Sequence, residues 1–236
     1  MMFLGLDLAW RSDPYPLSTG ACLIDSGGEV VLLGLVTTNE EILSLLDKDN
    51  QMWVGIDAPL CVPNLTGMRR CERIMMRMGL PCLPSNQRFM ERHFGGRRGE
   101  DLARALRGRG FVPASPEVRG EKVYFEVYPS GALRILCGKI PSYKRGRLCD
   151  RRKALEQVIE AMDSWHSPPD LCLSLRQEIE NMKLHRIKGL CDILDAALAA
   201  ACLYCHYIKN GKNTQLLGDV EHGYVLLPTE RNMHDG

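Results

Sequence analysis

Five acidic residues lie in otherwise apolar segments of this 236-residue sequence, and they are its strongest candidates for chemistry. They are Asp7 in FLGLDLAW, Asp57 in WVGIDAPL, Glu126 in VYFEVYPS, and Asp192 and Asp195 in GLCDILDAALAA. A buried carboxylate is costly unless it pairs with a cation. We therefore expect these residues to converge on a divalent ion, Mg²⁺ or Mn²⁺, because hard oxygen ligands favour these ions over zinc.

The two acids of the last segment belong to a predicted helix at Ile187–Ile208, which is rich in alanine and leucine. Asp192 and Asp195 are three residues apart and project from one face of it, where like charges repel. A bound cation would relieve this repulsion. In the alternative interpretation, one of them is exposed and the other caps a neighbouring loop. The sequence leaves open which one is the direct ligand, while the alanines predict that the helix lies close against a sheet.

The other three acids lie at or near the ends of predicted strands. The carboxyl ends of neighbouring parallel strands form ligand sites, so Asp7 and Asp57 would meet if their strands are adjacent. The alternative is a turn-forming role, which the run Asp57-Ala58-Pro59 resembles. Glu126 alternates with two tyrosines; it faces solvent, or joins the site if its strand is adjacent to the others.

Carboxylates around a pair of Mg²⁺ or Mn²⁺ ions are typical of phosphodiester hydrolysis. Two basic clusters, RRGEDLARALRGRG and KIPSYKRGRLCDRRK, add cations suited to phosphate contacts. The alternative for the second cluster is a solvated helical surface. The formal net charge of +1 does not itself indicate a nucleic-acid-binding protein.

The elements that must position these residues follow a recognisable order. Strands are predicted at Met2–Ala9, Gly20–Ile24, Val30–Val36 and Met52–Ile56, with a helix at Glu40–Asp47 capped by Asn39. This order predicts an α/β fold: a mixed β-sheet flanked by helices.

Residues 59–120 are rich in proline and form a predicted insertion after the fourth strand, with helices at Met68–Met78 and Glu100–Arg107. Residues 1–236 otherwise form a single domain. After the insertion the sequence predicts strands at Lys122–Val127 and Gly223–Leu227, and helices at Pro129–Leu136, Asp150–Asp163, Ser174–Asn181 and Ile187–Ile208.

Ten scattered cysteines without a secretion signal indicate free thiols in a reducing, cytoplasmic compartment. Cys202 and Cys205, with His206 beside them, lack the second ligand pair of a structural zinc site, so buried thiols are favoured over zinc. No apolar run is long enough to span a membrane, so no membrane partner is expected.

Several short motifs together resemble the DUF429 family, whose members are described as predicted nucleases of the ribonuclease H-like superfamily. They are GIDAPL, Arg70-Cys71-Glu72-Arg73, Glu126-Val127-Tyr128-Pro129, Tyr143-Lys144 and the DxxDA of Asp192–Ala196. The final helix also resembles that of RuvC-type Holliday junction resolvases. Those resolvases usually carry glutamate where this chain has Asp57, and they lack the proline-rich insertion.

The resemblance implies a ribonuclease H-like fold, a metal site and a nucleic-acid partner. The implied metal ligands are Asp7, Asp57, and Asp192 or Asp195, with Glu126 as a further site member. The implied substrate-facing residues are Arg70, Arg73, Lys144 and Arg147. Because resolvase-like enzymes commonly pair, a homodimer is a further expectation.

The leading hypothesis is a metal-dependent nuclease acting on DNA or RNA. One alternative is an actin-like or sugar-kinase-type phosphotransferase or ATPase, which would share the same core. That alternative lacks its glycine-rich phosphate loop, because Asp7 is followed by Leu8-Ala9-Trp10 and the SGGE sequence lies in a predicted hairpin. The other alternative is a catalytically silent nucleic-acid-binding module.

Overall fold

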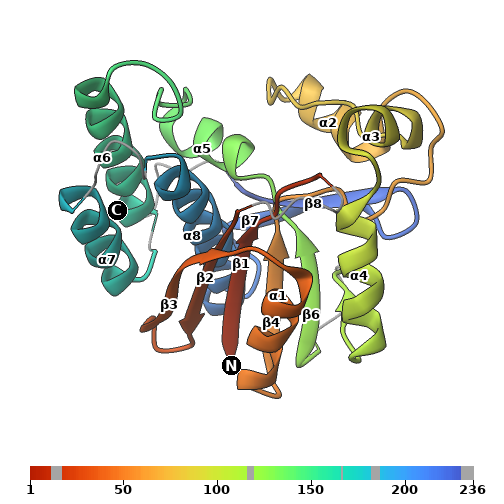
Figure 1. Ribbon diagram of the computed structural model, residues 1–236, viewed down its shortest axis with the longest axis horizontal. Helices are drawn as coiled ribbons and strands as arrows, with labels where there is room; N and C mark the ends of the chain where they lie inside the picture. The colour runs from red at the N-terminus through yellow and green to blue at the C-terminus, as the bar shows by residue number, and fades with distance from the viewer. Residues whose placement is uncertain (12–17, 116–119, 166, 182–186, 230–236) are drawn as a thin grey trace.

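The computed structural model describes residues 1–11, 18–115, 120–165, 167–181 and 187–229, and a six-stranded sheet runs through its centre (Figure 1). The strands are β1 (Met2–Asp7), β2 (Thr19–Asp25), β3 (Val30–Val36), β4 (Met52–Ile56), β5 (Val112–Pro113) and β6 (Lys122–Glu126). Their order in the sheet is β3-β2-β1-β4-β6-β5. Strands β1, β4, β6 and β5 are parallel, whereas β2 and β3 are antiparallel to their neighbours. This mixed sheet confirms the predicted fold class and is compatible with a ribonuclease H-like fold.

Helices cover both faces of the sheet. They are α1 (Asn39–Leu45), α2 (Arg70–Arg77), α3 (Gln87–Phe94), α4 (Arg98–Gly108), α5 (Pro129–Cys137), α6 (Leu148–Ser164), α7 (Pro169–Glu180) and α8 (Ile187–Ile208), with a 3-10 turn at Leu46–Lys48. A separate hairpin, β7 (Thr214–Asp219) with β8 (Gly223–Pro228), lies beside α2 and β6. None of the helices in these described segments is long and apolar enough to cross a bilayer.

Alternation along the strands separates two hydrophobic cores. One face of the sheet, with Phe3 and Trp53, packs against α5, α6, α7 and α8. The other face, with Leu6 and Ile56, packs against α1 and α4. Successive side chains of a strand point to opposite faces of the sheet. The face on which each acid of a strand lies therefore follows from which of its neighbours belong to which core.

Helix α8 lies directly on the sheet because glycines of two strands leave room for its backbone. A Cβ atom on Gly5 would come within 2.0 Å of the Ala196 carbonyl oxygen, and one on Gly20 within 1.9 Å of the Asp192 carbonyl oxygen. The alanines of α8 present similarly small side chains to the strands, and they are fully buried. The predicted close approach of this helix to the sheet is therefore confirmed. These contacts fix the position of the acids of α8 along the direction of the strands.

The sequence placed most elements but missed some. Strand β4 and helix α8 have the predicted bounds, whereas α3, β5 and β7 were not predicted. The helix after β3 is capped by Thr38 rather than by Asn39, because the Thr38 side chain and Glu41 form a reciprocal capping box. Residues 59–120 contain α2, α3, α4 and β5, and they lead from β4 to β6.

Candidate metal centre

Two of the predicted acids meet at the carboxyl ends of neighbouring parallel strands. Leu6 of β1 pairs with Ile56 of β4, and Asp7 and Asp57 each follow one residue later. The backbone N–H of Asp57 donates to the Leu6 carbonyl at 2.8 Å, which continues the pairing past the strand end. Both side chains lie on the α8 face of the sheet, because Gly5 and Gly55 two residues earlier contact that helix.

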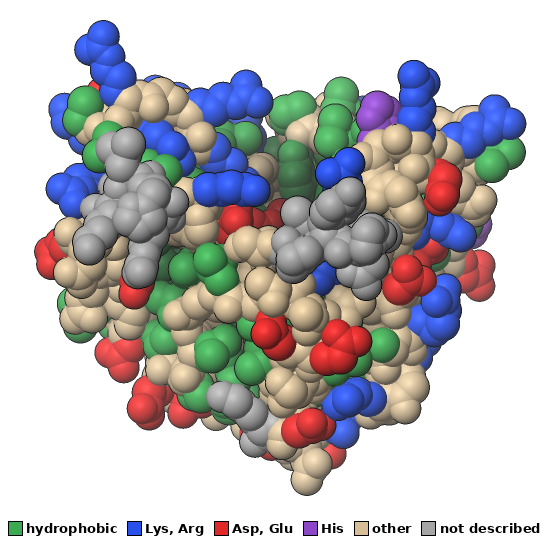
Figure 2. All heavy atoms as spheres, viewed as in Figure 1, with side chains coloured by type: hydrophobic (Ala, Val, Ile, Leu, Met, Phe, Trp, Pro, Cys, Tyr) green, Lys and Arg blue, Asp and Glu red, His purple; other side chains and the backbone are tan. Residues whose placement is uncertain are grey.

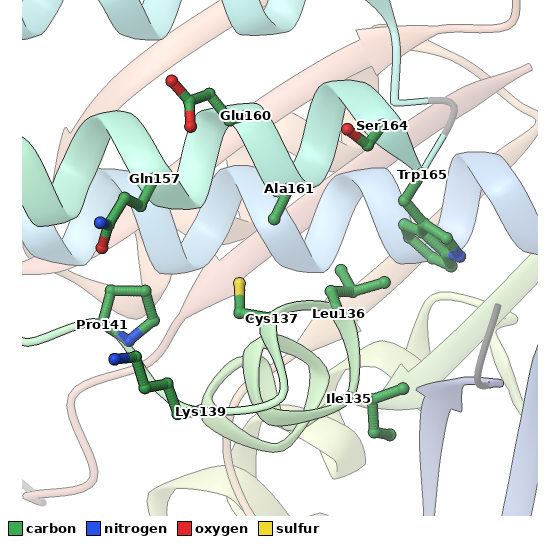
Figure 3. A pocket seen from close by; sticks show the side chains of 10 residues that line it. All are labelled: Ile135, Leu136, Cys137, Lys139, Pro141, Gln157, Glu160, Ala161, Ser164 and Trp165. Carbon is green, nitrogen blue, oxygen red and sulfur yellow. The ribbon is translucent and has the colours of Figure 1, made fainter.

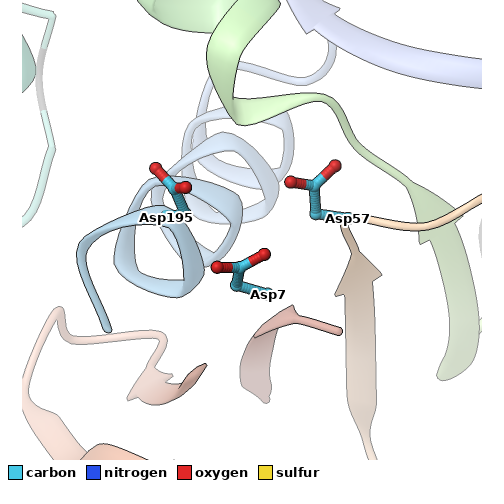
Figure 4. A group of neighbouring side chains, drawn as sticks. All are labelled: Asp7, Asp57 and Asp195. Atoms are coloured by element: carbon cyan, nitrogen blue, oxygen red, sulfur yellow. The ribbon is translucent and has the colours of Figure 1, made fainter. Parts of the chain in front are cut away.

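Asp195 reaches the same place from α8. One carboxylate oxygen from each of Asp7, Asp57 and Asp195 lies within 4.8 Å of the others, and Figure 4 shows the three side chains converging from two strand ends and one helix. We call these three residues the acidic triad. It is the only group of at least three histidine, cysteine or acidic residues with this spacing in the described segments.

Asp192 lies outside the acidic triad. Its backbone packs against Gly20 of β2, and its side chain is half-buried beyond the triad. Burial raises the pKa of Asp192, and the charge of Asp195 adds to the effect. Asp195 is therefore the acid of α8 that the structure brings together with Asp7 and Asp57.

The negative charges of Asp7 and Asp57 are only partly compensated, because Lys144 lowers their pKa values by less than burial and the neighbouring acids raise them. Within the described residues no side chain or backbone N–H donates to either carboxylate, although both are partly buried. Burial and the charges of Asp57 and Asp195 raise the pKa of Asp7 to about 9. Burial and the charge of Asp195 raise the pKa of Asp57 to about 8. Without a cation, both groups therefore favour the protonated form at neutral pH.

Asp195 is held by two neighbouring residues of the segment before α6. The buried Tyr143 hydroxyl donates to its Oδ1 at 2.6 Å, and the Lys144 ammonium forms an ion pair with its Oδ2. Burial opposes the charge of Lys144, but Asp195, Asp7 and Asp57 outweigh that effect and raise the pKa of the lysine. The Tyr143 carbonyl in turn accepts from Arg151 Nε at 2.7 Å, which fixes this segment to α6.

The acidic triad fits a divalent ion of the magnesium class. Its donors are hard oxygens, its spacing allows one ion to contact all three residues, and two carboxylates have no competing donor. When all are ionised, three carboxylates and the Lys144 ammonium leave two negative charges, which one divalent ion balances. The backbone is fixed as well, because the Trp10 indole N–H donates to the Asp57 carbonyl at 2.9 Å.

Glu126 does not join the triad. It pairs with Ile56 in the sheet and so points to the face opposite Asp57. There it is buried, at 4% exposure, rather than facing solvent. Burial raises the pKa of Glu126, while Arg69 opposes the rise. Both of its oxygens are occupied, because Arg69 donates to them at 2.6 and 2.8 Å and the Leu60 N–H donates at 2.9 Å.

Arg69, which the sequence reasoning missed, is the centre of a buried ion network. Besides Glu126, it donates through Nε to Glu72 at 2.7 Å and through a terminal nitrogen to the Cys61 carbonyl at 3.1 Å. Glu72 also accepts from the backbone N–H of Ser85. The network ties the loop before α3 to the end of β6. Its one local signal is the three-residue spacing of Arg69 and Glu72, which is common in surface helices.

The predicted substrate-facing residues have different surroundings. Lys144 lies at the triad with its side chain 49% exposed. Arg147 precedes α6 and is exposed. Arg70 is exposed and lies 3.7 Å from Asp219 of the β7–β8 hairpin, and Arg73 donates to the Met68 carbonyl. Of these four, Lys144 alone touches the triad.

A cavity of about 500 Å³ opens beside the triad. Its lining includes Asp57 and Lys144, and residues Pro81, Cys82, Leu83 and Ser85 of the loop before α3. Figure 2 shows a hollow at the top of the molecule, with α5, α6 and α7 on one side and α2 and α3 on the other, as labelled in Figure 1. Lysine and arginine side chains lie on both sides of this hollow.

Two other cavities lie away from the triad. One of about 380 Å³ lies between α5 and α6 and includes Lys139, Glu160 and Trp165 (Figure 3). Another of about 620 Å³ lies at the opposite end of the strands, next to Met1 and Gln51. Neither is lined by any of the predicted site residues.

Comparison with known proteins identifies a family but no activity. The sequence model of DUF429, described as a protein of unknown function, matches residues 12–222. No curated protein and no solved structure matches the chain.

Proposed function

The chain belongs to the DUF429 family, and because that family carries no described function, we propose one from the site itself: a metal-dependent nuclease that hydrolyses phosphodiester bonds in DNA or RNA. The observation that carries the proposal is the acidic triad, in which Asp7 and Asp57 have no hydrogen-bond donor among the described residues. Such carboxylates are costly unless a cation is bound, and Mg²⁺ or Mn²⁺ fits their oxygens.

The chain's own residues would divide the work as follows. Asp7, Asp57 and Asp195 hold the ion, which when bound supplies Lewis-acid polarisation of a phosphate oxygen and activation of water. Tyr143 keeps Asp195 in position through its 2.6 Å hydrogen bond. Lys144 presents a half-exposed ammonium at the edge of the triad, where it can contact a phosphate oxygen as negative charge develops.

The surface around the triad supports a polyanionic substrate. Lysine and arginine side chains lie on both sides of the hollow at the top of the molecule (Figure 2). Arg147 lies exposed a few residues beyond Lys144. These charges favour phosphate contacts without specifying a base sequence.

A phosphotransferase or ATPase on the same core is the runner-up, and a catalytically silent nucleic-acid-binding module is the third reading. The glycine-rich turn between β2 and β3 lies at the far end of the strands from the triad, because Met2 pairs with Asp25 while Asp7 pairs with Gly20. It is therefore poorly placed to bind phosphates at this site. A silent module does not require three converging, partly buried carboxylates, which weakens that reading.

We also propose that the protein works in a reducing, cytoplasmic compartment. All ten cysteines lie in the described segments and are free thiols. Burial raises the pKa values of six of them to about 11 or higher, as expected of structural thiols rather than reactive ones.

The test is cleavage of labelled single-stranded, duplex, hybrid and branched nucleic acids in Mn²⁺, Mg²⁺ or EDTA. Wild type is compared with Asp7→Asn, and with Asp163→Asn as a matched exposed control on α6. Metal-dependent cleavage that Asp7→Asn loses and Asp163→Asn keeps supports the proposal. Absence of cleavage on every substrate contradicts it, and ATP turnover that depends on Asp7 would favour the phosphotransferase.

A further inference from the structure

The position and the volume of the cavity beside the acidic triad indicate which kind of substrate could bind there. It holds about 500 Å³, within the range of pockets that enclose small ligands. Because Asp57 and Lys144 line it, a ligand in the cavity lies next to the groups that would handle the phosphate. A double helix is far too large to enter such a space, whereas a single nucleotide unit is of suitable size.

The walls of the cavity suit a flat, largely apolar group. Met75, Leu83 and Val225 contribute aliphatic surface, and Trp10 and Tyr128 contribute rings. Leu83 is 56% exposed, so part of its apolar surface is accessible to a ligand in the cavity. Nucleobases stack on aromatic rings and pack against apolar side chains whatever their sequence.

Two carboxylates that line the cavity, those of Glu72 and Glu126, already have hydrogen-bond donors. Both oxygens of Glu126 and of Glu72 accept hydrogen bonds within the Arg69 network. These groups therefore offer little capacity for reading the edge of a base. The Tyr128 hydroxyl donates to the Pro81 carbonyl, so its ring is held against the loop before α3, which also lines the cavity.

We infer that this cavity receives one unpaired nucleobase of the substrate, which places the adjoining phosphodiester at the acidic triad. The inference rests on the proposed nuclease function and deepens it. The substrate class is then a single-stranded or locally opened nucleic acid, accepted with little preference for base identity. A duplex is cleaved only where a base is displaced from the stack.

The first experiment measures binding by calorimetry, using adenosine 5′-monophosphate and ribose 5-phosphate as probes. These two compounds share the sugar and phosphate and differ in the base. In wild type the nucleotide should bind about tenfold or more tightly than the sugar phosphate, as stacking of one base predicts. Equal affinity for the two probes would overturn the inference.

Matched variants locate the binding. Leu83→Ser removes apolar wall at an exposed position and should weaken nucleotide binding several-fold without changing ribose 5-phosphate binding. Leu173→Ser on α7 is the control, because Leu173 is 55% exposed and lies outside the cavity. If both variants, or neither, altered nucleotide affinity, the base would not be bound in this cavity.

A second experiment separates this inference from the nuclease proposal. Single-stranded oligonucleotides are prepared with one abasic unit at successive positions, and the cut sites are mapped in Mn²⁺. Cleavage that slows about tenfold or more when the unit beside the cut lacks its base supports the pocket. Cleavage that ignores the abasic unit leaves the nuclease standing and overturns the pocket. Tight, Leu83-dependent nucleotide binding without any cleavage would instead keep the pocket and reject the nuclease.

Discussion

Asp7 and Asp57 lie side by side at the ends of two hydrogen-bonded parallel strands, one residue beyond the Leu6–Ile56 pair. The backbone there is fixed by the hydrogen bond from Asp57 N–H to Leu6. The backbones of the two residues cannot move apart without breaking that pairing, and the charge of Asp57 contributes to the raised pKa of Asp7. The sheet therefore holds together two groups that repel each other when ionised, which is the expected arrangement of a cation site.

Replacing one member of the acidic triad should abolish metal binding while preserving the fold. Asp7→Asn keeps the shape of the side chain but removes a negative ligand, so we expect loss of Mn²⁺ binding by calorimetry. Cleavage should fall by at least about 10²-fold. The metal-free variant should melt at the same temperature or higher, because repulsion is relieved. Undiminished ion binding in Asp7→Asn would remove Asp7 from the site.

Metal affinity should rise with pH. The raised pKa values of Asp7, about 9, and Asp57, about 8, mean that the ion must displace protons at neutral pH. Calorimetry in buffers of different ionisation enthalpy should therefore detect proton release, which declines toward about pH 9. A metal affinity independent of pH between about pH 6 and about pH 9 would contradict these raised values.

The same groups make the metal-free fold less stable as pH rises. Their folded-state pKa values exceed those of an unfolded chain, near 4, so the folded protein binds more protons between about pH 4 and about pH 9. The free energy of unfolding therefore falls as pH rises through that window. Thermal melts without metal should follow this trend, with a shallower slope in Asp7→Asn and a larger Mn²⁺ stabilisation at the alkaline end.

The charge of Lys144 predicts a single ion per chain. It leaves two negative charges in the ionised triad, so a titration with Mn²⁺ should give a stoichiometry near one. Lys144→Met should bind the ion about tenfold more tightly, because a competing cation is gone, yet cleave more slowly. Lys139→Met, in the separate cavity beside α6, is the control. Two equivalent ions in wild type would contradict this charge balance.

Arg69 should matter for stability far more than an exposed arginine does. Arg69→Met leaves Glu72 and Glu126 buried without their cation, which predicts a loss of about 3–5 kcal/mol in urea unfolding. Arg104→Met breaks an exposed pair with Asp101 and should cost about 1 kcal/mol or less.

Glu126→Gln should leave the affinity for Mn²⁺ unchanged. A loss of affinity comparable to that of Asp7→Asn would instead show that Glu126 belongs to the metal site.

Arg147 tests whether the exposed basic segment contacts phosphates. Arg147→Ala should weaken binding to single-stranded nucleic acid and reduce the slope of log affinity against log salt by about one. Arg109→Ala is a suitable control, because Arg109 pairs with Asp47 on the α1 side of the sheet. A salt slope equal to that of wild type would leave Arg147 as a solvated surface residue.

The sequence was sufficient for the strand-borne part of the site. Asp7 and Asp57 stood out because a charge inside an apolar run is rare, and the ends of parallel strands meet at one edge. The sequence could not choose between Asp192 and Asp195. That choice depends on where α8 lies along the strands of the sheet. The contacts of α8 with Gly5 and Gly20 determine this position.

Glu126 and Arg69 illustrate a different limit. Strand alternation allowed Glu126 to face solvent, and it does point away from the triad, but residues of the insertion cover it. Arg69 was not singled out in the sequence, and it is 4% exposed. Burial of both depends on how residues 59–120 fold back over β6, which no local pattern encodes.

The triad joins the first strand of the chain to its longest helix, and this has a consequence for biosynthesis. Asp7 and Asp57 are made early, but Asp195 enters only when α8 packs onto Gly5 and Gly20. A chain still emerging from the ribosome therefore has no complete ion site. The proposed activity would therefore require synthesis of the chain through α8 and packing of that helix onto the sheet.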